Sequence, residues 1–356
     1  MAKYDKNDKK TDYVAVLREL KEKGPARLYL LWGAEDYLRE SFFEELKRLC
    51  LFDGGGDFNY HRLAGSPLNL QKLTEAVDAV PFMGEKTLIE VRDFEVNAVK
   101  EDDAERLKSI ISDVPDYATV AFILPTGTEP DGRLTTVKSF KKLGSAIEFT
   151  TQPQSLLINW ITRRFQALGK SIGRAECEKL IFNSGELMTR LIPEIEKIAG
   201  YAKGAAVTAQ DIDKTAQRIP EASVFEMTDR LSEKDFDKAA ALLAELMQSG
   251  EHPIKILAMI GFQMRRLYTA RVAIDRGLGR DYVMQSCGIS YSFLADKLLK
   301  AAAGFSKAQL KKAVELCAES DYRMKSSSED DEDILKELLL RMALGESAVQ
   351  VSQGGL

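Results

Sequence analysis

The sequence predicts an α/β domain followed by segments that are entirely helical. Up to about residue 150, short apolar runs typical of strands alternate with stretches of helical periodicity, which favours a parallel sheet covered by helices. After Pro153 we find only helical periods. The 45% hydrophobic and 29% charged content is that of a globular chain and excludes a mostly disordered one.

The first part of the chain is expected to contain five strands with helices between them. Residues 118–124 (ATVAFIL) are continuously apolar, as in a strand that is covered on both faces. The strands are predicted at 27–32, 58–63, 87–91, 118–124 and 146–149, and the helices at 38–49, 68–80, 100–111 and 134–143.

The remainder of the chain shows helical stripes, such as Leu157, Ile161 and Phe165, and a long helix at 253–276. Composition and pattern change near Thr150 and again near Pro220. We therefore expect an α/β domain at 1–150, a small helical domain at 151–219, a helical domain at 220–345 and a flexible polar tail at 346–356. The acidic run at 329–333 is expected to begin a helix, because carboxylates there oppose the helix dipole favourably.

The composition of the sequence argues against several functional classes. The net charge of −5 disfavours an autonomous binder of duplex DNA, whose affinity depends on phosphate neutralisation. The chain has only two histidines, and its four cysteines lack the spacing of a zinc or disulfide framework, so free buried thiols are expected. No catalytic residue, metal or cofactor is predicted. No apolar run approaches 18 residues and no signal segment is seen, so we expect no membrane association and a cytoplasmic chain.

A phosphate-binding loop would read GxxxxGK[ST] directly after a strand, and Gly33 stands in that place after 27–32. Counting on from Gly33, Leu38 occupies the second glycine position, Arg39 the lysine position and Glu40 the hydroxyl position. Leu38 carries a Cβ where the loop needs bare backbone, and Glu40 replaces a neutral ligand of Mg²⁺. This degenerate loop predicts no nucleotide chemistry.

Two further carboxylates, Glu35 and Asp36, would face the phosphates of a bound nucleotide. At about 4 Å such like charges repel by roughly 1 kcal/mol in water and by about 4 kcal/mol at an effective dielectric of 20. Glu90 and Asp93 stand at the wrong offset for the metal-holding acidic pair of a motor site. A plain strand-turn-helix and an ATPase-like scaffold without nucleotide are both compatible with the loop, and the second fits the rest of the chain better.

The connection at 79–86 (AVPFMGEK) carries four consecutive apolar residues, Val80, Pro81, Phe82 and Met83, followed by Gly84. Helix-to-strand loops are usually polar, and Pro81 should end the preceding helix. Phe82 and Met83 would then project from a stiff tip, where an aromatic ring and a soft methionine suit a pocket on a partner protein. The alternative is that these side chains fold back into the domain core.

Several segments, in this order, resemble the bacterial DNA polymerase III delta subunit family over nearly the whole chain. They are LYLLWGAEDYLRESF, VPFMGEKTLIEVRDFE, INWITRRFQALGKSI, LIPEIEKIAGYAKGAAVTAQDI, SVFEMTDRLSEKDFDKAAALLAELMQSGEHPIKILAMIGFQMRRL and DYRMKS. The resemblance implies an AAA+-like α/β domain with a degenerate nucleotide site, a small helical lid and a helical collar that mediates oligomerisation. The boundaries near Thr150 and Pro220 agree with that division.

The resemblance also implies a mechanical function in DNA replication, within the DNA polymerase III holoenzyme, a nucleotidyltransferase, without catalysis by this chain. In the family, an apolar pair at the tip contacts the ring-shaped sliding clamp (the beta subunit) and opens it. Here the pair falls on Pro81 and Phe82, flanked by Val80 and Met83. Pro81 departs from the larger aliphatic residue that is usual there, so Phe82 is the main expected contact.

The partners implied by the resemblance are the gamma/tau motor subunits and delta-prime, in a heteropentamer through which primed DNA is loaded. Lys138, Lys141 and Lys142, or Arg265 and Arg266, could contact that DNA or form solvated helix faces. An active ATPase and an autonomous DNA-binding protein are the alternative functions, and the loop residues and the net charge argue against them.

Overall fold

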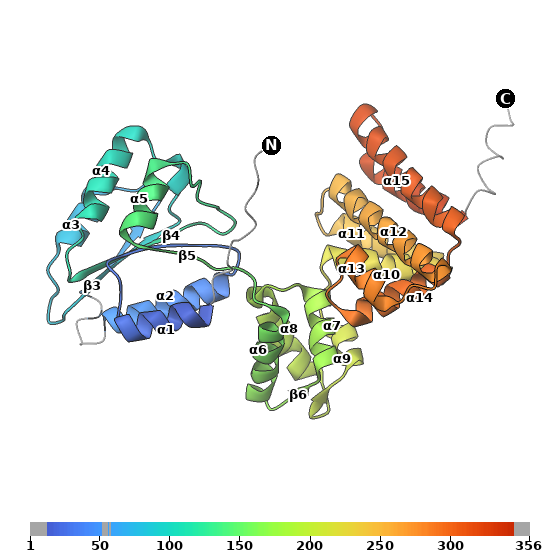
Figure 1. Cartoon of the computed structure of the whole chain (residues 1–356), viewed down its shortest axis with the longest axis horizontal. Coiled ribbons are helices and arrows are strands. Elements are labelled where there is room, and N and C mark those ends of the chain that lie inside the picture. The colour runs from blue at the N-terminus through green and yellow to red at the C-terminus, as the bar shows by residue number, and fades with distance from the viewer. Residues whose placement is uncertain (1–12, 52–55, 57, 345–356) are drawn as a thin grey trace. The chain divides into compact units, whose positions relative to one another are not determined.

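The computed structural model describes residues 13–51, 56 and 58–344. The chain divides into two compact units (Figure 1), the first made of residues 1–157 and 186–193 and the second of residues 158–185 and 194–356. The three-domain division expected from the sequence stays a prediction, and the expected tail at 346–356 lies outside the described residues.

The first unit is built on a five-stranded sheet in the order β2-β3-β4-β1-β5, with every neighbouring pair parallel. This confirms the α/β class with a parallel sheet. The strands are β1 (Leu28–Trp32), β2 (Tyr60–Ala64), β3 (Thr87–Arg92), β4 (Ala118–Ile123) and β5 (Ser145–Glu148).

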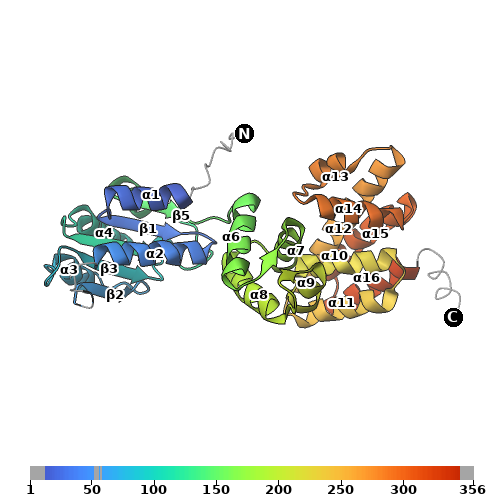
Figure 2. The ribbon, with the colours of Figure 1, turned by 90° about the horizontal axis from the view of Figure 1, so that it is seen from below.

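Helices cover both faces of this sheet, which is why all five residues of β1 and all six of β4 are buried. One face carries α1 (Tyr13–Lys23) and α2 (Asp36–Cys50), and the other carries α3 (Leu70–Asp78), α4 (Glu101–Ser112) and α5 (Thr135–Leu143) (Figures 1 and 2).

Aromatic rings form the centre of the core between the sheet and α3 to α5. The rings of Phe94, Phe122 and Phe140 are each at most 1% exposed, and their centroids lie 4.8 to 6.0 Å apart in tilted and edge-on pairs. These offset geometries are the favoured ones for aromatic packing.

The predicted strand at 58–63 begins two residues later than expected. Phe58 and Asn59 lie in a turn before β2, and the alternation of apolar and polar residues alone could not separate them from the strand. The helix predicted at 68–80 ends at Asp78, ahead of the Val80-Pro81 pair that disfavours helix.

After residue 153 the expectation of helices alone is wrong at one place. A two-stranded parallel ribbon, β6 (Ser171–Ile172) and β7 (Ala206–Val207), joins residues 35 apart in the sequence and is too short to give a periodic pattern. The helices around it are α6 (Gln154–Ala167), α7 (Arg174–Ser184), α8 (Met188–Tyr201) and α9 (Ala209–Thr215).

The C-terminal part of the second unit is a helical array packed around one long helix, α12, which contacts α14 and α15 most extensively. The helix α15 begins with a capping box between Ser306 and Gln309. The acidic run predicted at 329–333 places Asp331, Glu332 and Asp333 in the first turn of α16. The helices are α10 (Pro220–Ser232), α11 (Phe236–Gln248), α12 (Pro253–Asp275), α13 (Arg280–Cys287), α14 (Ser292–Ala303), α15 (Lys307–Ser326) and α16 (Asp331–Leu344).

Candidate functional site

The degenerate phosphate loop follows β1 and packs against the segment that leaves β5. Gly33 has φ +124°, and a Cβ there would lie 2.3 Å from the backbone oxygen of Phe149. The glycine is therefore required by the close approach of two protein segments. Leu38, at the second glycine position, is buried in α2.

Arg39, at the lysine position, is 5% exposed and engages neighbouring protein groups. Its Nη2 lies 2.7 Å from Oδ1 of Asp36, and the guanidinium also donates to Thr126 Oγ1 and to the backbone oxygen of Gly33, both at 3.4 Å. Thr126 in turn donates to the Asp36 carboxylate. The positive charge that a phosphate would need is thus already paired with Asp36.

Glu40, at the hydroxyl position, makes a bidentate ion pair with Arg92 of β3, at 2.6 and 2.8 Å. The Arg92 hydrogen bonds hold the pKa of Glu40 below its usual range. Arg92 also pairs with Glu90, a buried carboxylate that accepts a hydrogen bond from Tyr60. Glu90 is therefore part of a structural ion-pair network that reaches Glu40 through Arg92.

Glu35 is fully buried, and its carboxylate accepts the backbone N–H of Met188, at 3.2 and 3.3 Å. Met188 begins α8 and belongs to the same compact unit. Burial raises the pKa of Glu35 to about 7, although hydrogen bonds from the backbone N–H groups of Met188 and Tyr37 oppose the rise. The loop thus directs this carboxylate to a protein amide.

The described part of the chain has no candidate metal site, and its cysteines are buried. No group of three or more His, Cys, Asp or Glu side chains in residues 13–51, 56 and 58–344 could hold a metal ion. The four cysteines are free and buried, and burial raises the pKa of Cys50 and Cys177 to about 11. Within the same residues, no helix is long and apolar enough to cross a membrane.

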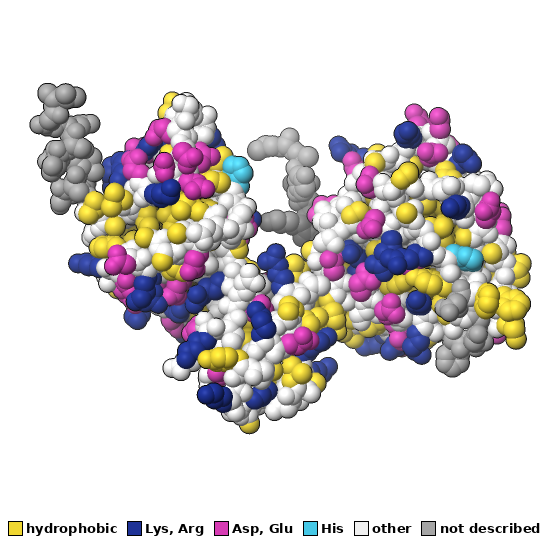
Figure 3. Space-filling model, turned by 180° about the vertical axis from the view of Figure 1, so that it is seen from behind, with side chains coloured by type: hydrophobic (Ala, Val, Ile, Leu, Met, Phe, Trp, Pro, Cys, Tyr) yellow, Lys and Arg dark blue, Asp and Glu magenta, His cyan; other side chains and the backbone are white. Residues whose placement is uncertain are grey.

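The tip predicted from the sequence lies between α3 and β3 at a corner of the first unit. The side chains of Val80, Phe82 and Met83 are 76%, 57% and 77% exposed, and Pro81 is half-buried. Figure 3 shows apolar side chains gathered at the right-hand edge of this unit. Phe82 and Met83 therefore do not fold back into the core.

Hydrogen bonds close the base of the tip. Thr87 Oγ1 donates to the backbone oxygen of Ala79 at 3.3 Å, and Tyr117 donates to the backbone oxygen of Asp78 at 3.4 Å. Met83 adopts φ +50°, an uncommon conformation for a residue other than glycine. The two ends of the loop are thereby held together while its apolar side chains face outward.

Two residues that the sequence predicts to lie in a strand contact the tip, one from a buried position and one from the surface. Asn59 is 4% exposed, and its side chain accepts the backbone N–H of Phe82 at 2.6 Å and donates to the backbone oxygen of Phe82 at 3.0 Å. Phe58 is 74% exposed, and its ring centroid lies 5.5 Å from that of Phe82. The signal that could have found them is the adjacency of β2 and β3, which brings together the residues that precede both strands.

The basic residues proposed for DNA contact are in different environments. Lys138, Lys141 and Lys142 are exposed on α5, and Arg265 is exposed on α12. Arg266 is half-buried, lies over the ring of Phe262 and donates to the backbone oxygen of Cys287 at 3.0 Å. Arg266 therefore has a packing role, and contact with DNA stays a prediction for the others.

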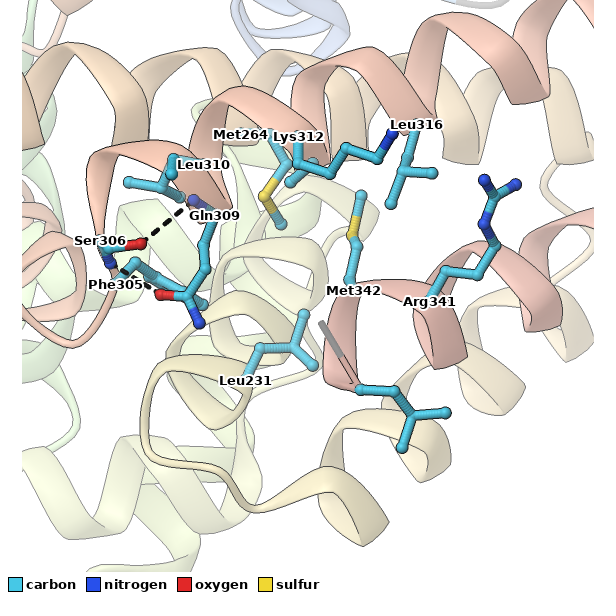
Figure 4. Close-up of a pocket in the computed structure, with 13 residues that line it drawn as sticks. Leu231, Met264, Phe305, Ser306, Gln309, Leu310, Lys312, Leu316, Arg341 and Met342 are labelled. Carbon is cyan, nitrogen blue, oxygen red and sulfur yellow. Dashed lines mark hydrogen bonds between the residues drawn. The ribbon is translucent and has the colours of Figure 1, made fainter. Parts of the chain in front are cut away.

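The C-terminal helices enclose a hollow of about 650 Å³. Figure 4 shows Leu231, Met264, Leu316 and Met342 around it, from four different helices, and Arg341 at its side. A second apolar hollow, of about 420 Å³, lies between α11 and α16, and exposed Phe236 and Leu340 lie along it. The end of α16 thus presents apolar surface on two sides.

Comparison with known proteins shows the family of the chain. The family model "DNA polymerase III, delta subunit" matches residues 29–150, and the model "DNA polymerase III delta subunit, C-terminal domain" matches residues 221–342. The two matched ranges cover more than half of the chain. The chain belongs to the DNA polymerase III delta subunit family.

Individual relatives are distant but extend over nearly the full length. The chain is 24% identical to DNA polymerase III subunit delta of Bacillus subtilis (strain 168), over 92% of this chain and 96% of the relative. It is 25% identical to a protein of Aquifex aeolicus (strain VF5) named "Probable DNA polymerase III subunit delta", over 92% and 95%. The solved structure of the Bacillus subtilis DNA clamp loader delta protein is 22% identical, with a TM-score of 0.46, over 94% of this chain and 100% of that one.

The raised pKa of Glu35 predicts a dependence of stability on pH that Glu35→Gln removes. The folded state holds the proton more tightly than the unfolded state, so the contribution of Glu35 is fully present below pH 4.5 and is lost as the pH rises to about 7. Between pH 5 and 8 the wild type should lose on the order of 2–3 kcal/mol of unfolding free energy relative to Glu35→Gln.

Thermal unfolding of both proteins across this pH range checks the prediction. Asp229, whose pKa burial raises to about 6, is present in both proteins, so its contribution cancels in the comparison. Parallel pH profiles for the two proteins would contradict the assignment.

Proposed function

We propose that this chain is the delta subunit of a clamp loader, and that it binds the sliding clamp through its apolar tip and holds the ring open. The observation that carries the proposal is the exposure of Val80, Phe82 and Met83 on a loop whose backbone is fixed by hydrogen bonds. A rigid aromatic side chain loses little entropy when a pocket of the partner takes it up, and such residues dominate binding energy at interfaces.

The proposed mechanism is mechanical. The tip enters an apolar pocket of the clamp beside one of its subunit interfaces and stabilises the open ring. The tip can shift the equilibrium between closed and open rings only by its differential affinity for the open form. ATP bound by separate gamma/tau motor subunits controls when the tip is available, and the clamp is then loaded on primed DNA at the bacterial replisome.

Assembly with the motor subunits and delta-prime is assigned to a C-terminal collar at 220–345. Apolar side chains on an otherwise charged surface mark interfaces with partner proteins, and Phe236, Leu340 and Leu344 are 40%, 56% and 52% exposed here. The α/β domain at 1–150 would carry the tip, and the small helical domain at 151–219 would be the lid of the AAA+-like architecture.

The degenerate loop supports a subunit that does not bind nucleotide. Arg39 is paired with Asp36, and Glu40 with Arg92. A phosphate at this site would have to break these pairs and approach the loop carboxylates, and buried charges are costly to leave without partners. An active ATPase is therefore the weaker alternative, and an autonomous DNA-binding protein is disfavoured by the net charge of −5.

Truncation of the aromatic tip tests the central proposal. Phe82→Ala should weaken binding of the isolated chain to the sliding clamp by about 2 kcal/mol, or roughly 30-fold, because a central aromatic anchor is lost. The unfolding free energy should change by less than about 1 kcal/mol, because an exposed side chain leaves no cavity. Leu143→Ala, another exposed apolar truncation in the same unit, should leave clamp affinity unchanged. A large loss of stability with intact clamp affinity would place the contact elsewhere.

The degenerate loop predicts that the isolated chain neither binds nor hydrolyses ATP. Titration with Mg²⁺ and ATP, followed by calorimetry, should give no saturable heat, and a phosphate-release assay should give no turnover. Tight binding that depends on Mg²⁺ and is lost on changing Arg39 would overturn the interpretation of this loop.

The exposed apolar side chains at the end of α16 predict that a mutation there weakens assembly without weakening clamp binding. Leu340→Glu should weaken assembly with the motor subunits at least tenfold, because it places a charge in an apolar contact, while clamp binding stays unchanged. Phe82→Ala should show the reverse pattern. Co-purification of each variant with the motor subunits and with the clamp measures both effects, and normal assembly of Leu340→Glu would move the interface away from α16.

A further inference from the structure

We propose that a second chain segment, Phe58 and Asn59, forms part of the clamp-binding surface. Phe58 would be a second aromatic contact, and Asn59 a positioning residue that holds Phe82 in its binding orientation. This inference rests on the proposed function of the tip.

Asn59 holds the backbone of Phe82 at two points. One side-chain amide accepts from the N–H and donates to the C=O of the same residue, at 2.6 and 3.0 Å. Two hydrogen bonds to one residue fix its orientation as well as its position, as a rung of a β-ladder does. Asn59 is itself fixed, because its backbone oxygen accepts the N–H of Leu88 in β3 at 2.8 Å.

Gly84 provides the space for this arrangement. A Cβ at residue 84 would lie 2.8 Å from Nδ2 of Asn59, closer than side-chain contacts normally allow. A side chain at residue 84 would therefore force the Asn59 amide to shift. Asn59 and Gly84 act together on Phe82, although one precedes β2 and the other precedes β3.

Phe58 extends the apolar surface beyond the loop. Its ring is 74% exposed, lies 5.5 Å from the ring of Phe82 at an interplanar angle of 59°, and continues the patch of Val80, Phe82 and Met83. Single exposed apolar residues are ordinary, but a contiguous group contributed by two chain segments is typical of a surface that a partner covers. The partner in this proposal is the sliding clamp, because the patch is continuous with the tip.

Clamp binding by Phe58→Ala, Phe82→Ala and the double variant tests the role of Phe58. If Phe58 contacts the clamp, Phe58→Ala should weaken binding at least fivefold, and the double variant should lose less than the product of the two single losses, because the rings touch. Unchanged binding by Phe58→Ala would overturn its role as a contact. Self-association of the wild-type chain that Phe58→Ala abolishes would assign the surface to a second copy and overturn the proposal as well.

Asn59→Ala and the matched variant Asn69→Ala test the positioning role. The side chain of Asn69 caps α3 through one hydrogen bond to the backbone N–H of Lys72, so both variants lose amide hydrogen bonds in the same unit. We expect at least tenfold weaker clamp binding for Asn59→Ala and less than a twofold change for Asn69→Ala. Hydrogen exchange at the Phe82 amide should become at least tenfold faster in Asn59→Ala and should stay unchanged in Asn69→Ala.

Gly84→Ala provides a variant that keeps every hydrogen-bonding group. It should reproduce the weaker clamp binding and the faster exchange at Phe82, because the new Cβ displaces the Asn59 amide. Normal exchange at Phe82 in both Asn59→Ala and Gly84→Ala would overturn the positioning role. Failure of the wild-type chain to bind the clamp would instead overturn the proposed function, and the exchange measurement distinguishes the two cases.

Discussion

The degenerate loop at Gly33 and the apolar tip at 80–83 both depend on one constraint, which is the common direction of the strands in the parallel sheet. In a parallel sheet all carboxyl ends lie at one edge and all amino ends at the other. The loop at Gly33 follows β1 and therefore lies at the carboxyl edge, whereas the segments before β2 and β3 lie at the amino edge. Tyr60 is in register with Leu88, so the residues that precede these two strands meet, and Asn59 reaches Phe82.

At the carboxyl edge, the charged side chains of the degenerate loop are paired with other groups of the protein. Arg39 pairs with Asp36, Glu40 pairs with Arg92, and Glu35 accepts the amide of Met188. Buried polar groups are costly unless they are partnered, and each of these partners is a protein group where a nucleotide-binding loop would use phosphate or metal. The loop keeps the geometry of a strand, a tight turn and a helix, while its side chains stabilise the fold.

Most of the fold of the first unit could be predicted from the sequence, because buried strands such as 118–124 are continuously apolar and the helices after β1 have clear stripes, whereas α1 was not predicted. The position of the apolar tip could also be predicted, since Pro81 ends the helix and an apolar loop follows, although the residues alone left open whether its side chains are exposed or fold back into the core. The partners of Asn59 and Glu35 could not, because they lie 23 and 153 residues away and depend on the order of the strands and the packing of α8. The ribbon of β6 and β7 was missed because two residues have no period.

The apolar side chains of the tip are proposed to bind a partner, and for that reason a polar side chain holds the loop in place. A loop is ordinarily fixed by burying its own apolar side chains, but Val80, Phe82 and Met83 must stay exposed if a partner is to take them up. The backbone is then what remains to be held, and its N–H and C=O groups require a polar partner. Asn59 supplies both a donor and an acceptor from a buried position, so the fold can hold Phe82 without covering it.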